Sequence, residues 1–434
     1  MTDDTLIVRR ADGPVIADVL VPPSKSIANR ALICAALADG ESTIIGLAPG
    51  DDTNAMISCL GALGIPIGVE SRNGTLVGQI MGTGGDLPVG PITLDTRLAG
   101  TTSRFVTALA ALGPGPYFID GEPPLRGRPM GPLHDSLHSL GARIEPGEEW
   151  GYLPVTVSGP LGGADAIVMP GDVSSQYVTA LMLIAPMIPG GVSLGLSTEL
   201  VSRPYVEITK SVMRAFGVPN VSVGERHITV PTGEYQPTEY TVEPDASSAS
   251  YPLAAAAMVG GAVSVKGLGR TSLQGDATFC DVLERMGCLV TVSDHDTVVM
   301  RRSDTPLLGI DINMADISDL VPTMAAVATQ ATSPTRITGV GFIRGKESDR
   351  LGDLAHEMTK LGADVTVNDD GLTIVPTDFL HGARLATHHD HRLAMSFGLL
   401  GLVVGGIEIE SPGVVSKSWP GFWDALAEMQ ARSL

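Results

Sequence analysis

The 434-residue sequence predicts an α/β protein built from six repeated units. Two interleaved series of short phrases and a core composition dominated by aliphatic residues support this fold class. In the first series, a predicted helix ends in an apolar residue and a glycine, and a strand of alternating apolar residues follows. These glycines are Gly64, Gly141, Gly217, Gly287 and Gly362, at spacings of 77, 76, 70 and 75 residues. Glycine suits these positions because it can adopt the left-handed conformation that ends a helix.

The second series runs out of phase with the first. A helix rich in Ala and Leu stops and a strand follows, for example at residues 42–45, 192–194, 262–265 and 407–409. The stops lie near Gly40, Gly115, Gly190, Gly260, Ser333 and Gly405, at spacings of 75, 75, 70, 73 and 72 residues. Two series that stay in step predict six units of about 72 residues, each holding two helices and several short strands.

The sixth unit lacks its final strands, because the chain ends inside a predicted helix at residues 421–433. A predicted strand at residues 6–9 can supply part of what is missing. We therefore expect two domains of three units each, with crossings at Pro22-Pro23 and Glu243-Pro244. Residues 1–22 and 243–434 would form a lower domain that the N-terminal strand closes, and residues 23–242 would form an upper domain.

Composition excludes several classes of protein. The chain has 28 basic and 48 acidic residues, a net charge of −20, which argues against a general nucleic-acid binder. Aromatic residues make up 4% and all apolar residues 44%, so Ala, Val, Leu, Ile and Met must fill the cores. The four cysteines stand in or beside apolar helical stretches, which favours buried, reduced thiols. We expect a cytoplasmic protein, because neither a signal peptide nor an apolar run of membrane-spanning length is visible.

Basic residues stand at or just before predicted helix starts, where a cation opposes the helix macrodipole. They are Lys25, Arg128, Lys346, Arg392 and Lys417. Such a placement is favourable if an anion lies between the cation and the free backbone N–H groups. We therefore expect helix N-termini of both domains to face one cleft that binds small anions carrying several charges. No Walker loop or dinucleotide fingerprint indicates a nucleotide.

Two acids lie among these cations and could transfer protons. Asp319 and Glu347 would stay ionised there and could act as bases. The alternatives are that Asp319 caps the helix that begins near Leu320 and that Glu347 is a surface partner of Arg350. Further acids and hydroxyls need only a capping role, namely Asp51, Asp52, Thr53, Asp276 and Ser248.

The run His388, His389, Asp390 and His391 has three interpretations. It could bind a metal, cap the helix that follows, or bind an anion with Arg392. Zinc would require further ligands elsewhere, and no cysteine pair or His-Glu motif supplies them. We therefore expect no metal.

An ordered series of motifs resembles the 5-enolpyruvylshikimate-3-phosphate synthase family, within the enolpyruvyl transferases. The match runs from about residue 22 to 420. Its motifs are Pro23-Ser24-Lys25-Ser26 with Asn29-Arg30, Leu98-Ala99-Gly100-Thr101 with Arg104, Leu125-Arg126 with Arg128-Pro129, Ser174-Ser175-Gln176-Tyr177, Ser202-Arg203-Pro204-Tyr205, Asp245 to Tyr251, Lys346-Glu347-Ser348-Asp349-Arg350, Asp390-His391-Arg392 and Lys417.

The resemblance implies a two-domain inverse α/β barrel with the active site in the cleft between the domains. It implies transfer of the carboxyvinyl group of phosphoenolpyruvate to the 5-hydroxyl of shikimate 3-phosphate, which releases phosphate. This is a step of the shikimate pathway toward chorismate and the aromatic amino acids. No metal or organic cofactor is implied. We expect a monomer that acts on these two small molecules and has neither nucleic acid nor membrane as a partner.

The resemblance also implies roles for individual residues. Lys25, Asp319 and Glu347 would be catalytic, with Asp319 as base for the 5-hydroxyl and Glu347, or its rival Lys25, moving the proton at the methylene carbon. Asp316 competes with Asp319, which we prefer because its distance to the following helix matches better. Shikimate 3-phosphate would be held by Lys25, Ser26, Arg30, Ser174, Ser175, Gln176, Ser202, Tyr205, Asp319 and Lys346. Phosphoenolpyruvate would be held by Lys25, Gly100, Arg128, Gln176, Arg350, Arg392 and Lys417.

The sequence departs from the family pattern at secondary positions. Ala28 replaces a common hydroxyl residue, Leu98 stands where many relatives have Asn, and Phe342 stands where some have a polar side chain. Gly100 leaves room at the phosphate of phosphoenolpyruvate, so sensitivity to the herbicide glyphosate is expected by resemblance.

Two rival functions are distinguishable. The related transferase that acts on UDP-N-acetylglucosamine usually has a loop cysteine and Lys-Asn where this chain has Lys25-Ser26, and Cys34 and Cys59 lie in predicted helices. A non-catalytic anion-binding protein on the same scaffold would not need Asp319 and Glu347.

Overall fold

The computed structural model describes residues 4–163 and 166–431, and its chain divides into two compact units. Unit 1 comprises Met1–Pro22 and Pro244–Leu434, so that both ends of the chain belong to it. Unit 2 is the continuous stretch Pro23–Glu243.

Unit 2 contains three four-stranded sheets that share one pattern, in which the first pair of strands is parallel and the next two pairs are antiparallel. The sheets are β14 (Glu239–Thr241), β3 (Asp39–Ile45), β5 (Thr75–Thr83) and β4 (Ile67–Arg72); β6 (Ile92–Asp95), β7 (Tyr117–Asp120), β9 (Val155–Ser158) and β8 (Arg143–Pro146); and β10 (Ile167–Met169), β11 (Val192–Leu196), β13 (His227–Val230) and β12 (Ser222–Val223). The helices are α1 (Lys25–Leu37), α2 (Asp51–Ala62), α3 (Gly100–Ala110), α4 (Pro123–Arg126), α5 (Gly131–Ser139), α6 (Ser175–Ile184) and α7 (Arg203–Ala215), with one 3₁₀ turn, η1 (Ala185–Met187).

Unit 1 repeats this pattern in two four-stranded sheets, and its third sheet has three strands, with one parallel and one antiparallel pair. The sheets are β2 (Val15–Val19), β15 (Gly261–Lys266), β17 (Asp296–Arg301) and β16 (Leu289–Val292); β18 (Asp311–Asn313), β19 (Thr335–Thr338), β21 (Gly371–Val375) and β20 (Asp364–Asn368); and β22 (Arg384–Leu385), β23 (Ile407–Glu410) and β1 (Thr5–Val8). The helices are α8 (Ala246–Val259), α9 (Phe279–Arg285), α10 (Val321–Ala328), α11 (Gly352–Lys360), α12 (His391–Val403) and α13 (Phe422–Ala431), with the 3₁₀ turns η2 (Gly275–Thr278), η3 (Ala315–Leu320), η4 (Gly341–Gly345) and η5 (Pro412–Lys417).

The prediction of six repeated α/β units is confirmed. Each of the five helix-ending glycines of the first series has a positive φ, from 81° at Gly64 to 103° at Gly287. The predicted strand near the N-terminus forms β1, which pairs antiparallel with β23 and takes the place of the missing strand in the sixth unit.

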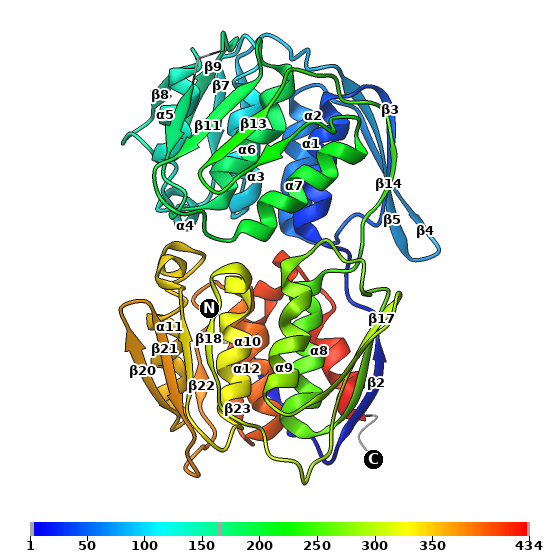
Figure 1. The fold of residues 1–434 in the computed structure, drawn as a ribbon, viewed down its shortest axis with the longest axis vertical. Helices are drawn as coiled ribbons and strands as arrows, with labels where there is room; N and C mark the ends of the chain where they lie inside the picture. Colours follow the sequence, from blue (N-terminus) through cyan, green and yellow to red (C-terminus); the bar gives the residue numbers. More distant parts are fainter. Residues whose placement is uncertain (1–3, 164–165, 432–434) are drawn as a thin grey trace. The chain divides into compact units, whose positions relative to one another are not determined.

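Three helices form the centre of each unit. In unit 2 these are α1, α3 and α6, and in unit 1 they are α8, α10 and α12, which contact one another within their unit. Figure 1 shows them inside each unit with the sheets around them. They are rich in Ala and Leu and buried on nearly every side, which is the pattern of a helix without a solvent face. Their first turns carry polar residues, among them Lys25 in α1, Thr101 in α3 and Arg392 in α12.

Only two of the five predicted cations stand in the first turn of a helix. Lys25 begins α1 and Arg392 is the second residue of α12. The prediction of a place at or just before a helix start holds for Arg128, three residues before α5, and is wrong for Lys346 and Lys417. Arg128 lies between α4 and α5, because the residue before Pro129 disfavours helical geometry. Lys346 follows η4 and Lys417 ends η5.

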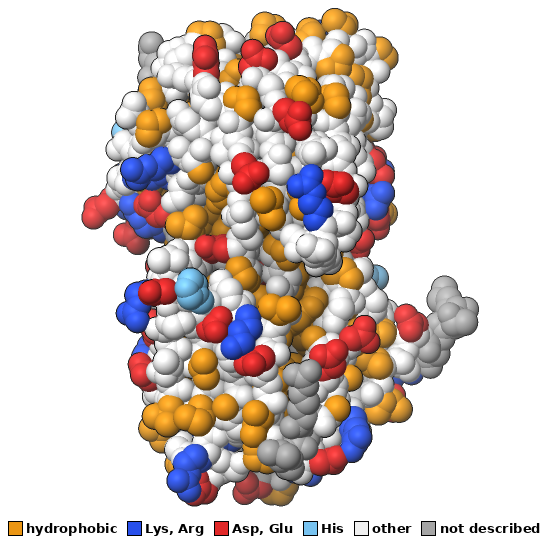
Figure 2. Space-filling view, turned by 90° about the vertical axis from the view of Figure 1, so that its right-hand side faces the viewer, with side chains coloured by type: hydrophobic (Ala, Val, Ile, Leu, Met, Phe, Trp, Pro, Cys, Tyr) orange, Lys and Arg blue, Asp and Glu red, His pale blue; other side chains and the backbone are white. Residues whose placement is uncertain are grey.

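The distribution of surface charge and the state of the cysteines can be compared with the sequence predictions. On the face in Figure 2, Lys and Arg side chains stand singly or in small groups among Asp and Glu. All four cysteines are buried and free, as predicted. Among the described residues, no helix combines the length and the apolar character needed to cross a bilayer.

Candidate active site

Seven charged residues of unit 1 form one bonded cluster, here called the unit 1 cluster. It consists of Asp319, Lys346, Glu347, Arg350, Asp390, Arg392 and Lys417. They come from η3, the loop between η4 and α11, the start of α12 and the end of η5. Six of them were predicted as site residues from the sequence, and Asp390 was predicted as part of a motif.

Arg350 is the hub of the unit 1 cluster. Its side chain is 1% exposed and donates four hydrogen bonds to three carboxylates. Nε binds Asp390 at 2.7 Å, Nη1 binds Asp319 at 2.9 Å, and Nη2 binds Glu347 at 2.7 Å. Burial opposes its charge, but the three carboxylates outweigh burial and raise the pKa of Arg350. A guanidinium so bound fixes the positions of the acids around it.

Asp319 is shared among several cations. Its second oxygen accepts a hydrogen bond from Arg392 Nη2 at 2.7 Å, and Lys346 Nζ lies 4.0 Å from the first. Burial would raise the pKa of Asp319, but Arg392, Lys346 and Arg350 outweigh it and hold the pKa far below its usual range. The capping alternative is wrong, because Leu320 is the N-cap of α10. Its competitor Asp316 is exposed.

Glu347 lies between Arg350 and Lys417. Its Oε1 is 3.6 Å from Lys417 Nζ, and its side chain is 15% exposed, so it is a partner of Arg350 but not a surface one. Lys346 Nζ lies 5.8 Å from the ring centroid of Phe342. Phe342, which departs from the family pattern, therefore packs beside a residue predicted to bind substrate.

Asp390 caps α12, because its Oδ1 accepts the backbone N–H of Arg392 at 2.8 Å. The capping interpretation of the histidine run is thus confirmed for Asp390. His391 is buried, and His388 contacts Glu357. Nowhere in residues 4–163 and 166–431 do three or more His, Cys, Asp or Glu side chains gather as a metal would require.

The first turn of α3 brings together three predicted residues of unit 2, Gly100, Arg128 and Gln176. A Cβ on Gly100 would lie 2.5 Å from Arg128 Nη1, so only glycine lets the guanidinium lie against the helix start. The next residue, Thr101, accepts a hydrogen bond from Gln176 Nε2 at 3.4 Å. Thr102 donates to the backbone oxygen of Asp52 at 3.0 Å. The N-cap of α3 is Ala99, whose side chain cannot cap, and this leaves the turn suited to an anion.

Lys25 is paired with Asp52 at 2.9 Å, with side-chain exposures of 14% and 3%. Sequence reasoning missed this pair, because Asp52 was assigned a capping role. The N-cap of α2 is Gly50, so Asp51, Asp52 and Thr53 lie inside the first turn. The sequence did hold a signal for this pair. A single acid, Asp51, is enough to interact favourably with the N-terminus of α2, so the second acid, Asp52, is available for another partner.

The other two capping assignments also need correction. Ser248 does not cap α8, because Asp245 Oδ1 accepts the Ser248 N–H at 2.7 Å and is itself the cap. Asp276 accepts a hydrogen bond from the Ser247 hydroxyl. Burial, together with the charge of Asp319, raises the pKa of Asp276 to about 7.

Arg30 is a buried cation held by neutral groups. Its side chain donates to Thr209 Oγ1 at 2.9 Å and to the backbone oxygens of Ser26 at 2.6 Å and Tyr205 at 3.2 Å. It also lies 5.9 Å from the ring centroid of Tyr205. Burial lowers its pKa to about 10. No carboxylate among the described residues bonds to it, so its charge lacks the counter-ion that a buried cation requires.

The predicted serines lie at helix starts of unit 2. Ser174 caps α6 by accepting the Gln176 N–H at 3.3 Å, and Ser175 begins that helix. Ser202 is the N-cap of α7 and has a left-handed backbone, with φ of 53°. Tyr205 follows in the first turn of α7, where its backbone oxygen bonds Arg30. Ala28, another departure from the family pattern, is fully buried in α1.

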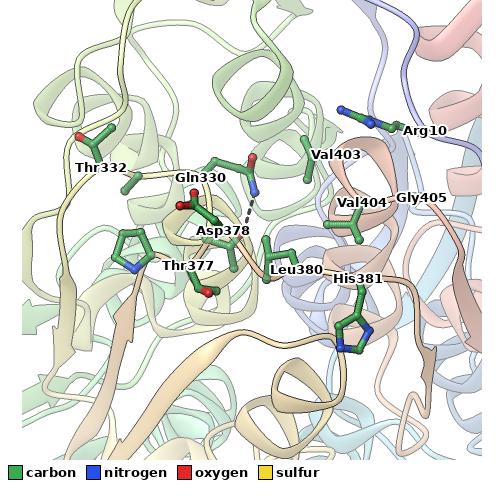
Figure 3. A pocket seen from close by; sticks show the side chains of 13 residues that line it. Arg10, Gln330, Thr332, Thr377, Asp378, Leu380, His381, Val403, Val404 and Gly405 are labelled. Carbon is green, nitrogen blue, oxygen red and sulfur yellow. Dashed lines mark hydrogen bonds between the residues drawn. The ribbon is translucent and has the colours of Figure 1, made fainter.

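A separate cavity of about 650 Å³ lies in unit 1, and no predicted site residue lines it. Gln330, Asp378 and His381 face it beside Val403 and Gly405, at the C-terminal end of α12 (Figure 3). Arg392 is near the other end of that helix, 11 residues before Val403 and so about 17 Å away along the axis. The cavity is therefore not the site of the predicted anions.

Known proteins resemble the chain over nearly its whole length. A family model described as EPSP synthase (3-phosphoshikimate 1-carboxyvinyltransferase) matches residues 10–426. A protein of that enzyme name from Methanosphaerula palustris is 44% identical over 419 residues, 96% of this chain and 97% of its own. Another from Trichormus variabilis is 40% identical over 427 residues, 98% and 99% of the two chains.

Solved structures agree in fold. The EPSP synthase of Acinetobacter baumannii superposes with a TM-score of 0.80 at 24% identity, over 98% of each chain. The enolpyruvyl transferase NikO from Streptomyces tendae gives a TM-score of 0.76 at 16% identity, again over 98% of each chain. The family model and the curated relatives together show that this chain belongs to the EPSP synthase family.

Proposed function

We propose that this chain transfers the carboxyvinyl group of phosphoenolpyruvate to the 5-hydroxyl of shikimate 3-phosphate, and so acts in the shikimate pathway toward chorismate and aromatic amino acids. The observation that carries the proposal is the full-length match to curated relatives named 3-phosphoshikimate 1-carboxyvinyltransferase. The predicted catalytic residues Lys25, Asp319 and Glu347 are all present, each bonded to a charged partner.

Charge neutralisation is the first task of such a site. The two substrates together carry roughly five or six negative charges, whose repulsion must be balanced before the reacting atoms approach. We propose that Arg30, with Ser26, Ser174, Ser175, Ser202 and Tyr205, holds shikimate 3-phosphate, which would supply the anion that the buried guanidinium lacks. Asp319 and Lys346 would hold the same substrate from unit 1.

We propose that phosphoenolpyruvate binds Arg128, Arg350, Arg392 and Lys417 beside Gly100, with Lys25 and Gln176 touching both substrates. Arg350 is already bonded to three carboxylates, so holding these acids in place would be a second task of the same side chain. Because the proposed ligands come from both units, the reaction would require both units to contribute to one site.

Asp319 is the proposed base for the 5-hydroxyl. In the unliganded protein its neighbouring cations keep its pKa so low that it is a weak base. Phosphoenolpyruvate would compete with Asp319 for Arg392, weaken that contact and raise the basicity of Asp319. The substrate would thus activate the base that the reaction needs.

The proposed reaction proceeds by addition and elimination. The 5-oxygen attacks C2 of phosphoenolpyruvate and loses its proton to Asp319, while the methylene carbon gains a proton from Glu347, with Lys25 as the alternative donor. The tetrahedral adduct still bears phosphate, and the surrounding cations stabilise its charge. Glu347 then takes a proton back from the new methyl group, the bond between C2 and the phosphate oxygen breaks, and the leaving phosphate takes the proton held by Asp319. The products are phosphate and enolpyruvylshikimate 3-phosphate, and both acids return to their starting state. No cofactor takes part in this scheme.

A phosphate-release assay tests the proposal. Mixing the protein with phosphoenolpyruvate and shikimate 3-phosphate should release phosphate in step with product, and replacing the acceptor by UDP-N-acetylglucosamine should abolish release. Absence of release above background with shikimate 3-phosphate would overturn the proposed function. We also propose a monomer in the cytoplasm, and sedimentation at assay concentrations tests the monomer.

A further inference from the structure

The segment before α12 has a costly backbone. His388 and His389 are consecutive non-glycine residues in the left-handed region, with φ of 50° and 58°. This conformation is unfavourable for a residue with a side chain, so neighbouring structure must hold it in place. The segment leads directly into Asp390 and Arg392 of the unit 1 cluster, so what holds it also sets where these two side chains stand.

Glu357 on α11 is the group that holds this segment. It is 1% exposed, and its carboxylate accepts the Ala386 N–H at 2.9 Å and contacts His388 Nε2 at 2.9 Å. Lys360 Nζ completes the shell at 2.8 and 2.7 Å from the two oxygens. Burial would raise the pKa of Glu357, but the hydrogen bonds from Lys360, His388 and Ala386 outweigh it and lower the pKa. The carboxylate therefore stays ionised and keeps both attachments to the segment.

The same helix also carries the other half of the unit 1 cluster. The loop with Glu347 and Arg350 runs directly into α11, whose first turn is held by Asp349 Oδ1 through the Leu351 and Gly352 N–H groups at 3.1 and 2.9 Å. Arg350 in turn bonds Asp390. Helix α11 thus fixes Arg350 through its start and Arg392 through Glu357.

We propose that Glu357 is a positioning residue for phosphoenolpyruvate binding, acting through His388 and the Ala386 N–H to place Asp390 and Arg392. It does not touch the substrate. The inference rests on the proposed function for the identity of the substrate, whereas the placement of the segment can be measured without any substrate.

The kinetic test compares Glu357→Gln with Glu284→Gln, a matched change at an exposed position of α9. Glu357→Gln should raise the KM for phosphoenolpyruvate about tenfold, by analogy with the lower end of the losses caused by removing a group that orients a metal-binding side chain. The KM for shikimate 3-phosphate should change less than about twofold. Glu357→Asp, which keeps the charge with a shorter reach, should give a smaller change in the same direction. A purely structural role would instead lower the active fraction and leave both KM values unchanged, and that result would overturn the proposal.

The second test is hydrogen exchange of the unliganded variants. The Asp390 N–H bonds the Thr387 oxygen at 2.8 Å and the Arg392 N–H bonds Asp390. Both amides should exchange faster in Glu357→Gln, whereas amides near Leu400 in the same helix should not change. Unchanged exchange at Asp390 and Arg392 would overturn the placement.

Two further variants separate the possible failures. In His388→Gly, the glycine can adopt the left-handed backbone, and Ala386 and Lys360 still hold the Glu357 carboxylate. This variant should therefore change hydrogen exchange less than Glu357→Gln does. A larger change would contradict the role of Glu357. Arg392→Ala should weaken phosphoenolpyruvate more than shikimate 3-phosphate. Equal weakening would overturn the substrate assignment of Arg392, while the exchange experiment would still decide whether Glu357 places the segment.

Discussion

The pairing of Lys25 with Asp52 joins catalysis to stability in one contact. Lys25→Ala should lower kcat by about 100-fold or more, because the cation that touches both substrates is lost. It should also lower the melting temperature, because Asp52 is 3% exposed in side chain and would lose this partner. Phosphate release and thermal unfolding measure the two effects.

The double variant Lys25→Ala with Asp52→Asn separates them. It should regain melting temperature without regaining turnover, since the carboxylate charge is gone but the cation is still missing. Lys266→Ala is the control, because Lys266 pairs with Asp18 and Asp296 at the surface. Near-normal turnover in Lys25→Ala would contradict the catalytic role.

Asp276 should make the protein less stable as the pH rises. Its folded pKa of about 7 is above the unfolded value of about 3.9, so its full contribution is present below pH 4 and is lost as the pH rises toward 7. Asp276→Asn cannot ionise and still accepts from Ser247. Relative to the parent protein, its melting temperature should therefore increase between pH 4.5 and 8. A difference that does not vary with pH would refute this assignment.

At single residues, the sequence predicted types better than partners. Asp319 and Glu347 were recognisable because both are acids among motif cations, and the structure places both in one cluster. The partners of Asp52 and Glu357 were invisible. An acid in the first turn of a helix is already explained by a local rule, so nothing in the sequence near Asp52 indicates a partner. Lys25 lies 27 residues before it. The His388 contact with Glu357 spans 31 residues, and no local pattern encodes it.

At the scale of elements, the start of α3 is the most sterically constrained part of the unit 2 site. Gly100→Ala would place a Cβ 2.5 Å from Arg128 Nη1, so the guanidinium must move. The KM for phosphoenolpyruvate should rise several-fold, while that for shikimate 3-phosphate changes little, and steady-state kinetics measure both.

Gly61→Ala is the matched control, because it lies in α2 with nothing within 4 Å of the added Cβ. It should leave the kinetics unchanged and raise stability by about 0.4–1 kcal/mol. A comparable kinetic change in both variants would show that Gly100 has no special relation to Arg128.

The spacing of the two repeated series predicted the helices and strands well, because the residue types in both series are typical of the ends of helices. It failed at several helix starts. Lys346 was placed at one, but α11 begins six residues later at Gly352, where Asp349 holds the first turn. Serines, aspartates and prolines favour turns as well as caps, so the same residues allow either a helix or a short 3₁₀ turn. Tertiary contacts decide between them.

At the scale of the whole molecule, the proposed ligands divide between the units. Ser26 and Arg30 belong to unit 2, and Asp319 and Lys346 to unit 1. Shikimate 3-phosphate with glyphosate should therefore draw the units together and reduce the radius of gyration in small-angle scattering, whereas inorganic phosphate alone should not. An unchanged radius at saturating ligand would contradict ligand-driven closure.

The threading of the chain has a consequence for how the protein is made. Strands β1 and β2 are synthesised before the other described strands, yet β2 pairs with β15, past the middle of the chain, and β1 pairs with β23, near its C-terminal end. The continuous stretch Pro23–Glu243 is synthesised whole in the meantime and closes on itself through β14 and β3. Strand β2 must therefore stay unpaired until more than half of the 434 residues are made, and β1 until β23 is made, so the second-made half of the polypeptide determines when both strands pair.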